Sequence, residues 1–342
     1  MDLVVARTSL TRAPGGGVMG KRTRRTRRTA LVATAAAIGL VAAACHAPIP
    51  GTSCTAFPDN SFWRADVSGL PVHTRSAAWV SSVGSSRGAH ADFGSGLWDG
   101  GPIGIPFDVV PGTQAKVPVS FDYADESDPG PYPIPPSPHI EGGAGSSGDR
   151  HVLVVDKDAC KLYETWSTYP NGNGGWNAGS GAVFDLRSNA TRPAGWTSAD
   201  AAGLPILPGL VQYDEVANGQ VQHAIRITIP RSSQAYIWPA RHQAGSTTDP
   251  NVPPMGAWFR VKASVDENRF DPFVRPIIRA LKTYGGIVAD NGSGWYLSGV
   301  PDERWDNDQL ATLSRLVGTD WEAVDTRTLV VDPNSWQASV TK

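Results

Sequence analysis

Two glutamates stand where they could do acid–base chemistry. Glu141 lies alone between a proline-rich tract and Gly142-Gly143, and Glu164 lies within the run Lys161–Trp166, beside aromatic residues. Hydrolysis of a glycosidic bond uses two carboxyl groups, one as the acid and the other as the base or nucleophile. If the two segments flank one groove, Glu141 and Glu164 are candidate catalytic residues. Surface or structural roles are the alternative for both.

A histidine and an aspartate complete the set of candidate catalytic residues. His223 lies in the run Val221–Ile229 and alternates with apolar residues, which favours a histidine satisfied within the core. Its alternative role is as an acid, base or ligand in a cleft. Asp290 opens the segment Asp290–Tyr296 (DNGSGWY), a predicted turn that carries an acid, an amide and two rings.

Tryptophan is the residue type that most favours a carbohydrate ligand. All 12 tryptophans follow the first 44 residues, and several lie beside glycine or polar residues: Trp98, Trp176, Trp196, Trp295 and Trp305. An indole in a polar loop offers a flat apolar face and one donor, which suits stacking on a sugar ring. The alternative is that these rings pack the interior. The candidate substrate-binding residues are Trp238, His242, Trp295, Tyr296 and Arg226.

An acidic stretch is the one candidate cation site. Its carboxylates lie on a loop after a predicted strand, and the candidate ligands are Asp122, Asp125 and Asp128. Hard oxygen ligands suit Ca²⁺, but the spacing is not that of an EF-hand, and a solvated acidic loop is the alternative. No cofactor is indicated with certainty. The separations of the three histidines do not support a zinc site made of His151, His223 and His242.

Most familiar catalytic motifs are absent from the chain. It has no HExxH, no CxxC, no P-loop and no GxGxxG after a strand. Gly84–Gly88 (GSSRG) fits the letters of a nucleophile elbow, and Ala77–Val83 is a candidate strand before it. An elbow also needs a helix after the serine, whereas a glycine-rich segment follows here. A simple Gly/Ser turn is therefore predicted.

The first 44 residues predict export. An arginine-rich segment, Lys21–Arg28, precedes the apolar run Thr29–Ala44, which is shorter than the roughly 20 residues of a membrane span. Met19 is a plausible start, and either the general secretory or the twin-arginine route fits. Cys45 is a candidate lipid anchor. In the alternative, cleavage after an Ala-x-Ala site removes Cys45, and the protein is secreted.

The cysteine count agrees with a lipid anchor. With Cys45 modified, Cys54 and Cys160 remain as one pair, and oxidising conditions outside the cytoplasm would let them bond. Such a disulfide would close a loop of about 100 residues, worth about 4 to 5 kcal/mol in the chain-entropy model.

Charge excludes one class of partner. The first 44 residues hold 8 of the 30 basic and 1 of the 32 acidic residues, which leaves 22 and 31, a net charge of −9. Nucleic-acid binding needs clustered Lys and Arg, and no cluster follows Arg28. We expect no nucleic-acid partner, and contact with a membrane only through the lipid anchor.

Glycine and proline, 65 of the 342 residues, exclude long helices over most of the chain. Short runs with period-two apolar positions predict strands at 116–123, 151–155, 161–166, 221–229 and 258–265. Helical spacing occurs at 198–202, 272–284 and 306–316. We predict a β-rich α+β fold, an antiparallel β-sandwich or barrel-like core with two or three short helices. The expected division is an export signal (1–44), a tether (45–56), one domain (57–325) and a C-terminal extension (326–342).

Three segments resemble a family of exported bacterial proteins of uncharacterised function: SADAAGLPILPGLVQYDEV, YIWPARHQAGSTTDPNVPPMGAWFRVKAS and ALKTYGGIVADNGSGWYLSG. The similarity runs from about Phe57 to Asp325. It implies one coherent domain and carries no activity or site residue.

Together these features predict an exported protein that acts on an extracellular polysaccharide as a glycosidase or lyase. The rival interpretation is a non-catalytic carbohydrate-binding or structural lipoprotein of the cell surface.

Overall fold

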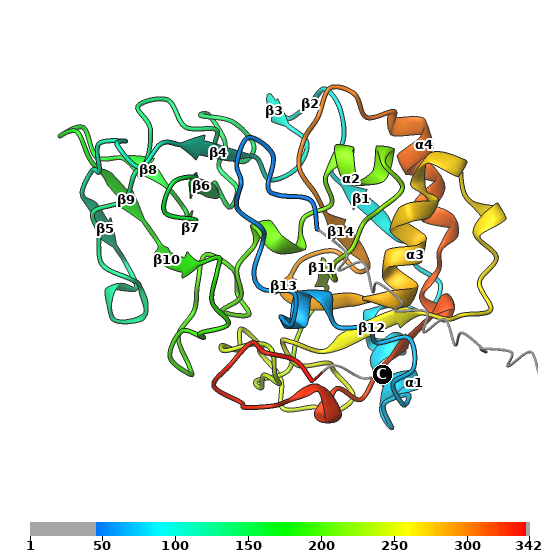
Figure 1. The fold of residues 1–342 in the computed structure, drawn as a ribbon. Coiled ribbons are helices and arrows are strands. Elements are labelled where there is room, and N and C mark those ends of the chain that lie inside the picture. The colour runs from blue at the N-terminus through cyan, green and yellow to red at the C-terminus, as the bar shows by residue number, and fades with distance from the viewer. Residues whose placement is uncertain (1–45, 340–342) are drawn as a thin grey trace, which may run out of the picture. The chain divides into compact units, whose positions relative to one another are not determined.

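Short strands in several sheets make up most of the regular structure, as the frequent glycines and prolines predict. The computed structural model describes residues 46–339, which belong to one compact unit (Figure 1). The predicted export signal and the predicted lipid anchor at Cys45 lie outside the described residues and stay predictions. No helix of residues 46–339 is long and apolar enough to cross a membrane.

The largest sheet has six strands. Their order is β1 (His90–Asp92), β14 (Tyr296–Ser298), β11 (Ile225–Ile229), β13 (Gly286–Asn291), β12 (Trp258–Val261) and β15 (Trp321–Ala323). β1 pairs with β14 and β11 with β13 in parallel, and the other pairs are antiparallel. All five residues of β11 are buried, so this strand lies in the interior.

A second sheet has four strands. Their order is β10 (Ser180–Asp185), β7 (Lys161–Trp166), β6 (Val152–Asp156) and β4 (Phe107–Val110). β6 and β7 form an antiparallel hairpin, and β4 pairs with β6 in parallel. Two small sheets complete the β-structure: β2 (Leu97–Trp98) with β3 (Gly101–Pro102), and β5 (Val119–Phe121) with β9 (Trp176–Ala178) and β8 (Tyr169–Pro170).

Four α-helices occur in the described chain: α1 (Ser76–Val83), α2 (Tyr213–Ala217), α3 (Arg275–Thr283) and α4 (Asn307–Ala311). α3 confirms the helix expected at 272–284; it packs beside β12 (Figure 1), and its residues Ile277, Ile278 and Leu281 are buried. α4 confirms the helix expected at 306–316, where a 3-10 helix continues it.

Two local predictions are wrong. Ala77–Val83 forms α1 rather than a strand, because Trp79, Val80 and Val83 bury one helical face. His223 lies before β11 rather than in it, since the strand begins at Ile225. The short turn predicted at 198–202 is present as a turn and does not extend into a helix.

The predicted α+β, β-rich class is confirmed, with limits on its details. No sheet among residues 46–339 closes into a barrel, and the parallel pairs show that the sheets are not purely antiparallel. Strand pairs far apart in sequence, such as β1 with β14, explain why the expected simple antiparallel arrangement was not met.

Tryptophan supplies much of the core. Five indoles are almost fully buried: Trp63, Trp258, Trp295, Trp321 and Trp336. One apolar cluster joins Leu153 and Leu162 of the four-stranded sheet to Ile225 and Ile227 of the six-stranded sheet. A chain without long helices therefore fills its interior with large rings.

The predicted disulfide is confirmed, since Cys54 and Cys160 are bonded with their Cα atoms 5.5 Å apart. The segment expected to be a tether packs on the domain: Ile49 is 3% exposed, and its N–H donates to the Cys54 carbonyl. The expected C-terminal extension does the same through Trp336, whose Nε1 donates to the Pro239 carbonyl at 3.0 Å. Both segments are therefore part of the domain: the disulfide holds the first, and the buried Trp336 ring holds the second.

Candidate functional site

A cavity of about 320 Å³ lies where the ends of β7 and β13 meet the turn 197–201. None of its lining residues is Lys or Arg. The side chains that could act chemically are four carboxylates, a histidine and two aromatic rings: Glu126, Asp149, Asp200, Asp290, His242, Tyr123 and Trp166. We name this the acidic cavity.

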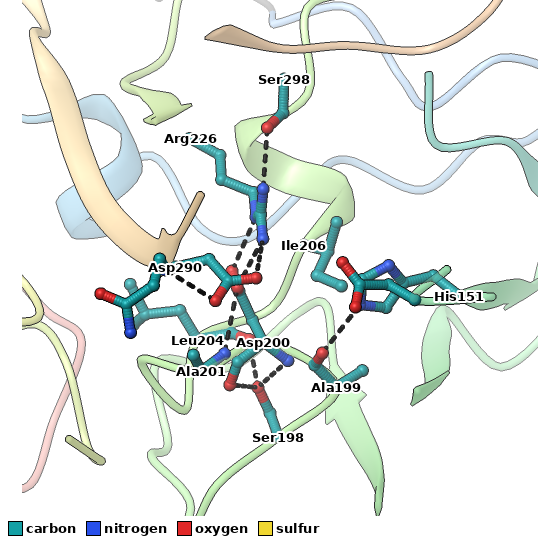
Figure 2. Close-up of polar contacts among 12 residues, drawn as sticks. His151, Ser198, Ala199, Asp200, Ala201, Leu204, Ile206, Arg226, Asp290 and Ser298 are labelled. Carbon is teal, nitrogen blue, oxygen red and sulfur yellow. Dashed lines mark hydrogen bonds and ion pairs between the residues drawn. The ribbon is translucent and has the colours of Figure 1, made fainter. Parts of the chain in front are cut away.

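Arg226 lies beneath the acidic cavity and binds two of its aspartates. It alternates with Ile225 and Ile227 along β11, so its side chain lies on the opposite face of the sheet. Its Nε and Nη2 donate to Asp200 at 3.0 and 2.8 Å, and Nη2 also donates to Asp290 Oδ2 at 3.0 Å (Figure 2). Nη1 donates to Ser298 Oγ at 2.8 Å. Arg226 is 4% exposed and engaged at every nitrogen, so it supports Asp290 and is no substrate-binding residue.

Asp290 keeps a proton more readily than an ordinary aspartate. Burial raises its pKa to about 6, although the charge of Arg226 opposes the rise. The negative charges of Asp200 and Asp149 add to the rise. Its Oδ1 accepts from the Asn291 N–H at 2.7 Å, and its side chain is 23% exposed, so it lies at the edge of the cavity. Asp290 can therefore be protonated in mildly acidic solution.

Asp149 is a second carboxylate of the same cavity, in a different environment. Its side chain is exposed, and Oδ1 accepts from Trp166 Nε1 at 3.2 Å. The Trp166 ring lies beside Tyr123, with centroids 6.4 Å apart. An aromatic pair therefore borders the exposed acid.

Glu141 and His151 form an ion pair next to Asp149. His151 Nδ1 lies 2.6 Å from Glu141 Oε2. Its Nε2 lies 2.9 Å from the Ala199 carbonyl, the contact drawn in Figure 2. Burial opposes the charge on His151, but the charge and hydrogen bond of Glu141 outweigh it and raise its pKa to about 9. The pKa of Glu141 falls below its usual value, because His151 outweighs its burial. The imidazolium donates both of its protons.

One cluster of side chains could in principle bind a metal ion. Within residues 46–339, it consists of Glu141, Asp149 and His151, whose ligand atoms lie within 4.8 Å of one another. Both nitrogens of His151 already have partners, so a metal would have to break them. The donor set does not fit a resident ion.

The predicted calcium ligands Asp122, Asp125 and Asp128 do not converge as a group in the described part of the chain. Asp128 has a structural role instead: its Oδ2 accepts from the Val183 N–H at 2.8 Å and from Arg192 Nε at 2.9 Å. The acidic loop is therefore tied to β10 and not arranged around a cation.

Glu164 lies outside the acidic cavity and binds backbone groups. Its side chain is fully buried, and its carboxylate accepts from the N–H groups of Ile206 and Leu207 at 2.9 to 3.0 Å. Burial raises its pKa to about 7, against the effect of these hydrogen bonds. The carboxylate holds the start of the 3-10 helix Leu207–Gly209 in place.

The two histidines predicted for the site, His223 and His242, line different cavities. His242 lines the acidic cavity; its Nδ1 donates to the Ala201 carbonyl at 2.8 Å, and Nε2 lies 3.8 Å from Glu126 Oε2. His223 lies at another cavity of about 130 Å³ and contacts Glu215 at 3.2 Å and the Ala224 carbonyl at 2.8 Å. Both nitrogens of His223 thus have partners, as expected of a satisfied histidine, and the side chain also lines this second cavity, as in the alternative role.

The predicted aromatic ligand contacts do not face the acidic cavity. Trp295 is fully buried and stacks on Trp321, with centroids 5.0 Å apart. Trp238 Nε1 donates to the Ser335 carbonyl at 2.9 Å, and Tyr296 packs on His90. Trp305 is also buried, whereas Trp98 is 78% exposed. The glycine-rich contexts of these rings did not determine their exposure.

Asp149 and Trp166 were missed as site residues, although a signal for them exists. The β6–β7 hairpin pairs Val152 with Thr165, so its open end brings the residues before β6 close to the end of β7, where Trp166 reaches Asp149. A hairpin predicted from the runs at 151–155 and 161–166 would have placed Asp149 near Trp166, although not directly opposite it.

No family model, no curated protein and no solved structure matches this chain. The function is therefore argued from the geometry of the site, and the resemblance to exported bacterial proteins stays a prediction.

Proposed function

We propose that the acidic cavity hydrolyses glycosidic bonds of an extracellular polysaccharide. The observation that carries the proposal is that Asp149 and Asp290 line one cavity in different environments. Asp290 has a raised pKa, as a general acid requires, and Asp149 supplies the second carboxyl group that is needed as base or nucleophile.

Asp290 is the general acid in this mechanism. Its proton passes to the glycosidic oxygen as the bond from that oxygen to the anomeric carbon breaks. The carboxylate left behind is stabilised by Arg226, whose Nη2 lies 3.0 Å from Oδ2. The electrons of the broken bond stay with the leaving oxygen, which the proton neutralises.

Asp149 acts on the anomeric carbon, either directly or through a water molecule whose proton it takes. It lies near the Glu141–His151 pair, and its charge contributes to the raised pKa of His151. Trp166 and Tyr123 provide apolar faces for a sugar ring beside it. His242 and Glu126 line the same cavity and can contact sugar hydroxyls.

Hydrolysis is favoured over the lyase reaction of an acidic sugar. Such a lyase needs free basic groups near the base, and Arg226 is occupied by Asp200 and Asp290. Arg241 is likewise engaged by the carbonyls of Arg192 and Pro333. Neither arginine is available to bind a substrate carboxylate.

The alternative is a non-catalytic carbohydrate-binding or structural protein that uses the same rings. We also propose that the protein is exported and held at the cell surface through Cys45 or secreted. For the fold, we propose that the two larger sheets pack as a sandwich, because their apolar residues share one core.

The test is a panel of polysaccharides assayed for new reducing ends and, separately, for binding. Wild-type protein should release reducing ends from at least one glycan, and Asp149→Asn and Asp290→Asn should abolish release while binding persists. Glu303→Gln is the matched control, because Glu303 is exposed and no hydrogen bond or ion pair of its carboxylate occurs within residues 46–339. Binding by the wild type without new ends would contradict hydrolysis and favour the binding protein.

A further inference from the structure

The β2–β3 hairpin exposes two large apolar side chains. Trp98 is 78% exposed and Leu97 is 69% exposed, the highest values among the large apolar residues of the described chain. Exposing an indole to water forgoes the stabilisation that its burial would give. Such a ring at a hairpin tip points to a ligand or partner that covers it.

Glycine leaves the Trp98 ring uncovered. Trp98 pairs with Gly101 across the hairpin, so the position opposite the indole carries no side chain. Gly100, before it in the turn, has a φ of +85°, and a side chain there would meet no atom within 4 Å. The hairpin therefore presents the indole without neighbours that shield it.

The hairpin contacts the segment that follows Glu141. A side chain at Gly101 would overlap the backbone of Gly142, so the two glycines pack directly together. Gly142 follows Glu141, whose carboxylate oxygen lies within 4.8 Å of a ligand oxygen of Asp149. A series of contacts, Gly101 with Gly142 and Glu141 with Asp149, therefore connects the hairpin that carries Trp98 to a residue of the acidic cavity.

Charge favours a glycan over a membrane as the occupant of this edge. Asp99 is the only charged residue between Gly94 and Gly104, and no Lys or Arg lies in that segment. Burial raises the pKa of nearby Asp92, and the negative charges of Glu141 and Asp149 add to the rise. This negative edge would repel anionic lipid headgroups, whereas a neutral or amine-bearing sugar polymer meets no such repulsion.

We propose that Trp98 is an outer sugar-binding platform, which extends the acidic cavity along Glu141 to hold a neutral or amine-bearing polysaccharide. The inference rests on the proposed function for the identity of the ligand. It adds that the substrate is a polymer long enough to reach from Trp166 to Trp98, and that short oligosaccharides use only the cavity.

The test compares Trp98→Ala with Trp98→Phe and with Val331→Ala, which removes exposed apolar surface elsewhere, at a residue that is 56% exposed. The probes are cellulose, chitin, chitosan and xylan, their soluble dimers, and vesicles of phosphatidylethanolamine and phosphatidylglycerol. Trp98→Ala should bind at least one polymer roughly fivefold to tenfold more weakly, with dimer binding and melting temperature unchanged. Trp98→Phe should restore most of the affinity, and Val331→Ala should match the wild type.

Equal polymer binding by Trp98→Ala and wild type, or no binding of any polymer by the wild type, would overturn the inference. So would a loss of vesicle binding in place of polymer binding. Hydrolysis is tested separately by the release of reducing ends. If polymer binding depends on Trp98 but no new ends appear, only the proposed reaction is contradicted. If new ends appear but Trp98→Ala binds the polymer like the wild type, only the platform is contradicted.

Discussion

The Arg226 guanidinium binds the buried carboxylate of Asp200 through two hydrogen bonds and reaches Asp290 Oδ2 at 3.0 Å with the same Nη2. One buried cation thus anchors a structural aspartate and a cavity-lining aspartate. Since Asp200 is fully buried, the pair couples the stability of the fold to the position of the proposed acid.

Removing Arg226 should destabilise the fold severely. Arg226→Met leaves the Asp200 charge buried without a partner, which we expect to lower the free energy of unfolding by about 3 to 5 kcal/mol in urea titrations. Adding Asp200→Asn to that variant should recover part of the loss, because the stranded charge is then gone. Additive losses in the double variant would show that the two side chains are not coupled.

Hydrolysis should depend on the protonation of Asp290. Its folded pKa of about 6 implies that kcat/KM declines as the pH rises above about 6, because the general acid loses its proton. The measurement is the pH profile on a glycan that the wild type cleaves. A rate that stays constant from pH 5 to 8 would rule out Asp290 as the acid.

The stabilisation by the Glu141–His151 ion pair should be lost in alkaline solution. The pKa of His151 is raised from 6.5 to about 9, so the stabilisation is fully present below pH 6.5 and is lost as the pH rises through 9. We expect the free energy of unfolding to fall over that range by an amount on the order of 3 kcal/mol. In Glu141→Gln, which removes the charge that raises this pKa, the decline should be much smaller. An unchanged slope would argue against the pair.

Glu164 should affect stability and not catalysis. Glu164→Ala strands the N–H groups of Ile206 and Leu207 and leaves a cavity, at an expected cost of about 2 to 5 kcal/mol. Glu164→Gln keeps one acceptor oxygen and should cost less, as thermal unfolding would show. The kcat of both folded variants should equal that of the wild type, and a large loss of kcat in Glu164→Gln would restore Glu164 as a catalytic candidate.

Opening the disulfide should lower stability through the unfolded chain. Cys54 and Cys160 are 106 residues apart, and the chain-entropy model assigns such a loop about 4 to 5 kcal/mol. Cys54→Ser/Cys160→Ser should unfold at correspondingly lower urea concentration, and reducing agent should have no further effect on it. If reductant still destabilised the double variant, the effect would lie elsewhere.

The sequence by itself determined several local features of this protein. Alternating residues in Lys161–Trp166 matched β7 residue for residue, and the helical spacing of Ile277, Ile278 and Leu281 located α3. The parity of the cysteines identified the disulfide. Each of these follows from short-range periodicity or from a count, so no knowledge of distant neighbours was needed.

Only the tertiary structure decided which residues meet. Arg226 joins Asp200 and Asp290 because β11 pairs with β13, a pairing that no local pattern specifies. Likewise, Trp295 and Trp98 both stand among glycines, yet one is buried on Trp321 and the other is exposed. Burial and long-range contact depend on segments brought together from across the chain, and that is the information a linear pattern does not hold.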